Sequence, residues 1–110
     1  MCGSGGLLTV VRMTHTLNRY LIERTIPGAG RLSADELRAI AQKSTEVLAG
    51  MAPRAQWVQS FVTDDAIFCV YLAEDEEALR EHGNCGGFPV DAVREVRVVI
   101  DPTTARNGSA

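Results

Sequence analysis

Two residues of this chain, His82 and Cys85, have side chains that bind transition metals and lie close together in the sequence. They are three positions apart in a segment predicted to be helical, so both side chains can lie on one side of that helix. Imidazole and thiolate both suit nickel, copper or zinc, and a carboxylate such as Glu23 would complete such a site. The alternative is that His82 is packed and hydrogen-bonded inside the protein and binds no metal.

Motifs that would indicate an enzyme are absent from the sequence. The chain has no phosphate-binding loop, no CxxC pair, no HExxH sequence and no Ser-His-Asp order. Cys69 would need a neighbouring base to act as a nucleophile, and its predicted strand supplies none. We therefore expect a binding protein rather than an enzyme, while an oxygenase or isomerase without a cofactor stays open by fold analogy alone.

The composition narrows the choice of partners and compartment. The chain has 110 residues, with 11 basic and 14 acidic side chains, so we expect one domain that binds neither nucleic acid nor an anionic membrane. The number of cysteines is odd, and Cys69 lies within a predicted strand, which favours free thiols and a cytoplasmic location. The N-terminal apolar run, residues 7–11, is too short for a signal peptide or for a membrane span of about 20 residues.

The pattern of the chain predicts three parts: a flexible N-terminal extension at residues 1–17, a domain at residues 18–105, and a frayed tail at residues 106–110. Ser33 and Glu36 have the spacing of a capping box, and Asp75 is the predicted cap of the second helix. Asp64-Asp65 is the predicted turn between the two strands of a hairpin. The domain then reads strand, helix, strand, strand, helix, strand. These elements are expected at residues 18–25, 33–50, 56–63, 66–73, 75–84 and 92–100.

This order of elements is that of the ferredoxin-like α+β fold, a βαββαβ sandwich. Right-handed crossovers give an antiparallel sheet with strand order 4-1-3-2 and place both helices on one face. The opposite face of the sheet therefore has no cover within the chain.

Alternation along each strand divides the side chains between the two faces. The helix-covered face is expected to receive the purely apolar set, Tyr20, Ile22, Phe68, Val70, Leu72, Val96, Val98 and Ile100. The uncovered face then receives Leu21, Glu23, Trp57, Gln59, Phe61, Cys69, Tyr71, Glu95, Arg97 and Val99. Such an apolar face predicts a homodimer in which two sheets face each other and enclose a cavity.

The more polar residues of the uncovered face would line that cavity. A small organic ligand bound there would contact Glu23, Trp57, Gln59, Tyr71, Glu95 and Arg97. The alternative is that Glu23, Glu95 and Arg97 pair with one another at the dimer interface and that no ligand binds.

An ordered set of segments gives the chain a family resemblance. They are residues 20–24, 57–65, 69–71, 80–82, 87–89, 95–97 and 100–104. Together they resemble a small bacterial family of domains of unknown function whose best described member is an actinobacterial nickel-binding protein. The resemblance covers residues 18 to about 105, and it implies a ferredoxin-like subunit that pairs into a dimeric α+β barrel and binds Ni²⁺. Family members often have His at the position of Gln59, and Gln is the weaker ligand for a transition metal.

Overall fold

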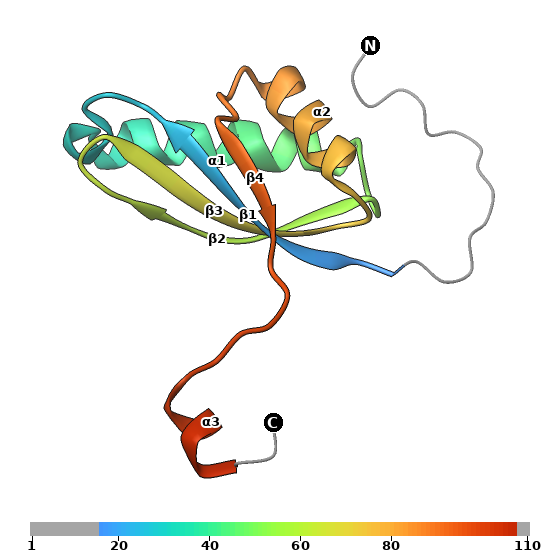
Figure 1. Ribbon diagram of the computed structural model, residues 1–110. Coiled ribbons are helices and arrows are strands. Elements are labelled where there is room, and N and C mark those ends of the chain that lie inside the picture. Colours follow the sequence, from blue (N-terminus) through green and yellow to red (C-terminus); the bar gives the residue numbers. More distant parts are fainter. Residues whose placement is uncertain (1–15, 108–110) are drawn as a thin grey trace.

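The computed structural model describes residues 16–107, in which helices α1 and α2 cover one face of a four-stranded antiparallel sheet (Figure 1). The strand order β2-β3-β1-β4 is the predicted order 4-1-3-2 counted from the other edge, so the ferredoxin-like α+β fold is confirmed. Most of the predicted extension and the last residues of the predicted tail lie outside the described residues. The elements are β1 (Asn18–Thr25), the 3-10 helix η2 (Ala29–Arg31), α1 (Ala34–Ala49), β2 (Ala55–Val62), β3 (Ala66–Ala73), α2 (Glu76–Gly86), β4 (Ala92–Glu95) and α3 (Pro102–Asn107).

Both long helices begin at the caps that the sequence predicts. The Ser33 hydroxyl accepts a hydrogen bond from the Glu36 backbone N–H at 3.1 Å, and the Glu36 carboxylate accepts one from the Ser33 N–H at 2.8 Å, which completes the capping box of α1. Helix α2 begins at Asp75, whose carboxylate accepts from the Ala78 N–H at 2.8 Å. It ends at Gly87, whose φ of 74° is a left-handed conformation that favours glycine.

Strand β2 contains a β-bulge that changes which side chains face the helices. Its pairing with β3 joins Trp57 to Tyr71 and Gln59 to Val70, so Val58 is an extra residue without a partner. Beyond the bulge, Ser60 lies opposite Cys69. Trp57 therefore lies on the helix-covered face, and the prediction that it lies on the open face is wrong.

The prediction for β3 is also reversed. Tyr20 and Ile22 are buried on the helix-covered face, as expected, and they lie opposite Tyr71 and Cys69. Cys69 and Tyr71 are thus in the core, whereas the Phe68, Val70 and Leu72 side chains lie on the open face. An all-apolar strand gives no polar residue from which its inward face could be read, and its neighbours decide the register. The core consists of Tyr20, Ile22, Ala29, Met51, Ala55, Ile67, Cys69, Tyr71, Ala73, Ala78 and Leu79.

The last strand is shorter than predicted. β4 ends at Glu95 rather than at Ile100, and the following residues leave the sheet as an extended arm that leads to the short helix α3 (Figure 1). Val98, Val99 and Ile100 are 74%, 62% and 72% exposed, so the expectation that Val98 and Ile100 are covered by helices is wrong. Arg106 and Asn107, the first two residues of the predicted tail, are the last two residues of α3.

Candidate functional site

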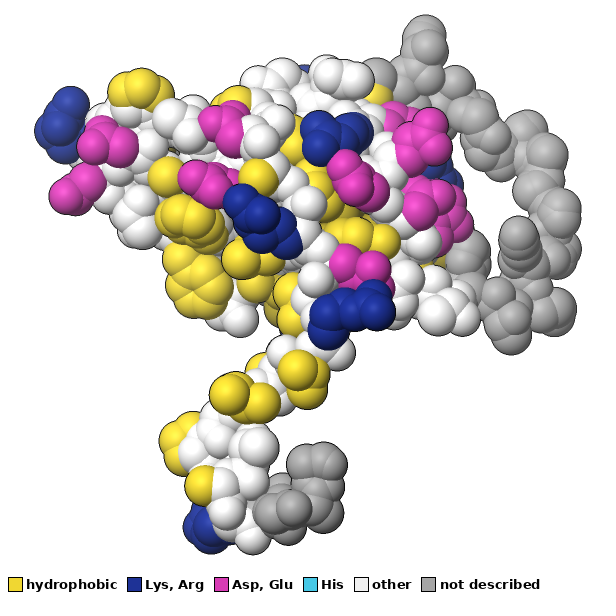
Figure 2. Space-filling model, viewed as in Figure 1, with side chains coloured by type: hydrophobic (Ala, Val, Ile, Leu, Met, Phe, Trp, Pro, Cys, Tyr) yellow, Lys and Arg dark blue, Asp and Glu magenta, His cyan; other side chains and the backbone are white. Residues whose placement is uncertain are grey.

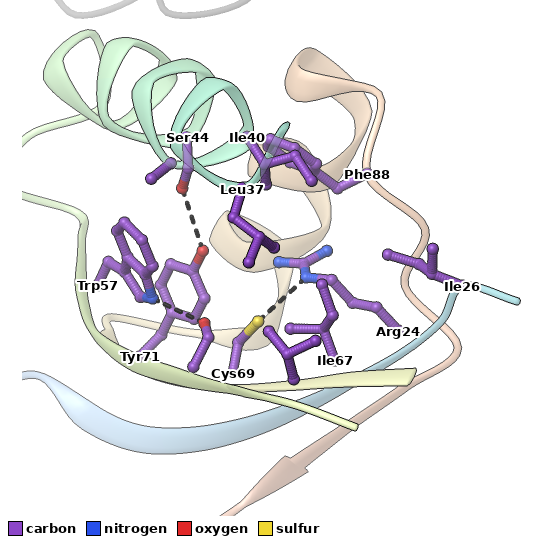
Figure 3. A pocket seen from close by; sticks show the side chains of 13 residues that line it. Arg24, Ile26, Leu37, Ile40, Ser44, Trp57, Ile67, Cys69, Tyr71 and Phe88 are labelled. Atoms are coloured by element: carbon purple, nitrogen blue, oxygen red, sulfur yellow. Dashed lines mark hydrogen bonds between the residues drawn. The ribbon is translucent and has the colours of Figure 1, made fainter. Parts of the chain in front are cut away.

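A cavity of about 240 Å³ lies between α1 and the helix-covered face of the sheet (Figure 3). Most of its walls are apolar side chains from α1, β2 and β3. Val62, which is 42% exposed, belongs to the lining, so the cavity reaches the surface beside β2. The lining consists of Arg24, Ile26, Leu37, Ile40, Ala41, Ser44, Trp57, Ser60, Val62, Ile67, Cys69, Tyr71 and Phe88.

The one ionisable cation of this lining is Arg24, which is only 4% exposed. It is the third inward residue of β1, after Tyr20 and Ile22. Its Nε donates to the Cys69 sulfur at 3.4 Å and its Nη1 to the Pro89 carbonyl at 2.8 Å, while Nη2 has no partner. No ion pair joins Arg24 to a carboxylate within residues 16–107. The buried guanidinium therefore has one hydrogen bond to a carbonyl, one contact with a sulfur and two aromatic rings beside it, and one of its nitrogens has no hydrogen-bond partner.

The two aromatic rings that contact the guanidinium are those of Tyr71 and Phe88. The Arg24 Cζ atom lies 6.0 Å from the centre of the Tyr71 ring and 5.5 Å from that of Phe88. At these distances the electron-rich ring faces stabilise a cation, by about 2 kcal/mol where water is excluded. This stabilisation offsets only part of the several kcal/mol that burial of an ion costs.

A chain of polar side chains borders the cavity. The Ser44 hydroxyl lies 3.4 Å from the Tyr71 hydroxyl and 3.1 Å from His82 Nε2. Burial raises the pKa of the Tyr71 hydroxyl, against the opposing effect of the Ser44 hydrogen bond. Burial, together with the positive charge of Arg24, lowers the pKa of His82 to about 4. At neutral pH both groups are therefore uncharged.

His82 is fully buried, and this placement agrees with the packed, hydrogen-bonded alternative. Its ring stacks on Phe88 at 5.5 Å between ring centres, and its Nδ1 atom has no partner. Cys85, at the end of α2, is half-buried and disulfide-bonded, so it has no free thiolate for a metal, and the expectation of free thiols is wrong for this residue. Glu23 lies on the opposite face of the sheet, so one chain does not bring it to His82. Within residues 16–107, no three His, Cys, Asp or Glu side chains gather as a metal site.

The six residues predicted to line a barrel cavity do not share one face. Trp57 and Tyr71 line the cavity under α1, where Trp57 Nε1 donates to the Ser60 hydroxyl at 2.9 Å. Glu23 and Gln59 remain on the open face. Glu95 is on an edge strand in register with Tyr20, and its carboxylate pairs with Arg97 at 3.3 Å in solvent. Glu95 and Arg97 thus pair within one chain and without Glu23, and the predicted pairing of all three at a dimer interface stays a prediction.

Arg24 and Ser44 are not among the site residues predicted from the sequence. The signal for Arg24 was available, because it continues the alternation of Tyr20 and Ile22 along β1. Ser44 lies one turn after Ile40 and Ala41 on the apolar face of α1, where a small polar residue gives no indication of its partners.

The open face of the sheet is a second apolar feature of the described residues. Leu21, Phe68, Val70 and Leu72 are only half-buried there, and Phe61 is 50% exposed. Figure 2 shows hydrophobic side chains gathered below the helical layer and along the arm that follows β4. A continuous apolar surface of this kind is unusual on a monomer.

The fold and these two surfaces define the class: a ferredoxin-like α+β protein with a cavity under α1 and an uncovered sheet. The family model described as "Nickel responsive protein SCO4226-like" matches residues 20–96, which is more than half of the chain. The chain therefore belongs to this family, as the resemblance implied.

The crystal structure of SCO4226 from Streptomyces coelicolor A3(2) has the same fold. It superposes with a TM-score of 0.64 over 74% of this chain and 99% of the SCO4226 chain, at 16% identity. No curated protein sequence matches the chain. Among the helices of residues 16–107, none is long and apolar enough to cross a membrane.

Proposed function

We propose that this protein binds a divalent transition metal, with Ni²⁺ as the leading candidate, and that it does so as a homodimer. The observation that carries the proposal is the match of residues 20–96 to a family described as nickel responsive. The resemblance of the ordered segments to a nickel-binding family points in the same direction.

One chain does not supply a complete set of ligands from its described residues. The Nε2 atom of His82 is hydrogen-bonded to the Ser44 hydroxyl, and the His82 ring stacks on that of Phe88. His15, the other histidine, lies outside residues 16–107. A transition metal takes four or more ligands, so the site requires donors from a second copy or from outside the described residues.

Among the candidate metal ligands, Glu23 is the one whose burial would increase most on dimerisation. It is half-buried on the open face, beside Phe68 of β3 and Ala92 of β4. It is the only carboxylate that the described strands place on this face. When two such faces pair about a two-fold axis, each copy buries one Glu23, and a buried carboxylate is destabilising by several kcal/mol unless a cation accompanies it. A bound metal would supply that charge, and Arg19 or Arg94 on the same face is the alternative.

Thermal melting of the tag-free protein with nickel, zinc, cobalt and copper salts tests the proposal. A metal that binds only the folded dimer raises the melting temperature, by RT ln(1 + [M]/Kd) in free energy. We expect nickel to raise it, a chelator to reverse the rise, and Glu23→Gln to reduce the rise. His82→Gln should leave it unchanged because His82 does not reach the open face.

Two control variants test which residues bind the metal. His15→Gln reports whether the segment before residue 16 contributes a donor, and Glu77→Gln removes an exposed carboxylate of α2 with the same loss of charge as Glu23→Gln. Absence of a shift with any metal, or a nickel shift that Glu23→Gln leaves intact, would contradict this assignment. A shift abolished by His82→Gln would restore His82 as the ligand.

A further inference from the structure

The cavity under α1 is built differently from a metal site. Its one charged group is a guanidinium, its remaining walls are almost entirely apolar, and no carboxylate of residues 16–107 pairs with Arg24. A buried ion without a counter-ion destabilises the folded protein, and the destabilisation decreases when an anion binds beside it. The feature that needs a partner is thus the unpartnered Nη2 atom, on a side chain that Figure 3 shows extending toward the middle of the cavity.

We propose that this cavity binds a small apolar monocarboxylate whose carboxylate group pairs with Arg24. The geometry sets the chemical class in three respects. Arg24 offers one free nitrogen, so one anionic group is matched and a phosphate or sulfate dianion is not. Leu37, Ile40 and Ile67 favour a hydrocarbon body. The volume of about 240 Å³ is below the range of about 300–1,000 Å³ for drug-sized ligands, so a short alkyl chain or one aromatic ring fits.

The polar groups beside Arg24 do not compete with this ligand. The Ser44 hydroxyl is within hydrogen-bonding distance of the Tyr71 hydroxyl and of His82 Nε2, and Trp57 donates to Ser60. Cys69 accepts from Arg24 Nε and Pro89 accepts from Nη1, so Nη2 is the one guanidinium nitrogen without a hydrogen-bond partner, and it is buried. Because this site lies on the helix-covered face, it is independent of the metal site proposed for the open face, and each can fail without the other.

Binding of sodium hexanoate to the full-length protein tests the proposal. Trp57 is the only tryptophan of the chain and lines the cavity, so its fluorescence reports occupancy, and titration calorimetry supplies the affinity. Hexanamide has the same size without the charge. We expect saturable binding of hexanoate at least about tenfold tighter than that of hexanamide, the difference that one charge-assisted hydrogen bond produces.

Three variants locate the site. Arg24→Met should abolish the preference for hexanoate, and Ala41→Phe, which fills the cavity from α1, should abolish binding of both compounds. Arg38→Met removes an exposed arginine of the same helix and should bind as the native chain does. Equal affinity for the two compounds, absence of saturable binding, or a preference that persists in Arg24→Met would overturn the proposal. If Arg24→Met does not fold, the comparison of the two compounds on the native chain and on Ala41→Phe still decides it.

Discussion

At the scale of single residues, the buried polar pair of Ser44 and His82 determines how the protein responds to acid. His82 has no exposed surface, and its pKa is lowered to about 4 first by burial and second by the charge of Arg24. The unfolded chain binds a proton at His82 near pH 6.5, whereas the folded chain resists protonation until about pH 4. The stability that this residue contributes is therefore present above pH 6.5 and is lost as the pH falls from 6.5 to 4.

We expect the free energy of unfolding to fall by about 2 kcal/mol between pH 7 and pH 5 because of His82. Urea denaturation at the two pH values measures this loss. His82→Gln keeps a hydrogen-bonding group beside Ser44 but does not titrate, so its pH dependence should be flatter by that amount. Both proteins contain His15, so its contribution cancels. Equal pH dependence of the two proteins would show that His82 does not titrate as its burial indicates.

At the scale of secondary-structure elements, the bulge in β2 determines which of its side chains face the helices. Without Val58, the pairs Trp57 with Tyr71 and Gln59 with Val70 would follow each other in a regular ladder. The register of β2 against β3 therefore shifts by one residue at Val58, and removing Val58 would bring the two halves of β2 into one register. It places Trp57 and Ser60 in the cavity and leaves Phe61 on the open face, a combination that strict alternation does not allow.

We expect deletion of Val58 to be tolerated, with a loss of stability within about 1 kcal/mol, because it joins two halves that are in register. The Trp57 emission maximum should stay that of a half-buried indole. Deletion of Val70 is the matched control. β3 is a central strand with partners on both sides, so removing one residue there reverses the faces of half a strand and should prevent folding. Comparable losses of stability from the two deletions would contradict the assignment of Val58 as an extra residue in β2.

For the whole molecule, the open sheet face and the arm after β4 both expose apolar side chains. Phe61 on the sheet and Val98 to Ile100 on the arm are half or more exposed. The two surfaces extend from one side of the domain (Figures 1 and 2). Both can be covered by a second copy of the chain, which would offer its own sheet face and arm.

We expect a dimer in light scattering coupled to size exclusion at tens of micromolar. Phe61→Glu should dissociate it, because a charge placed in an apolar contact is left unpaired. Gln42→Glu, which adds the same charge on the exposed side of α1, should not. A native chain that elutes as a monomer would refute the dimer, and so would a Phe61→Glu variant that remains dimeric.

The sequence by itself determined the four strands, the two long helices and their order, but not the short helices η2 and α3 or the end of β4. The Ser33 and Asp75 caps, the Asp64-Asp65 turn and the alternation of β1 depend on neighbours in the chain, so they could be predicted from local chemistry, and the crossover rule then gave the sheet order. The ordered segments also indicated membership of the nickel responsive family, because their resemblance lies in the sequence itself.

The tertiary structure decided which faces those elements present. Phe68, Val70 and Leu72 are as apolar as Cys69 and Tyr71, so only the register of β3 against β1 placed the second pair inside. The bulge at Val58 turned Trp57 inward, and the departure of the arm exposed Val98. The cavity combines Arg24, Ser44 and Phe88 from three separate parts of the chain. No local pattern contains that combination, because it arises only when α1 and the loop after α2 pack on the sheet.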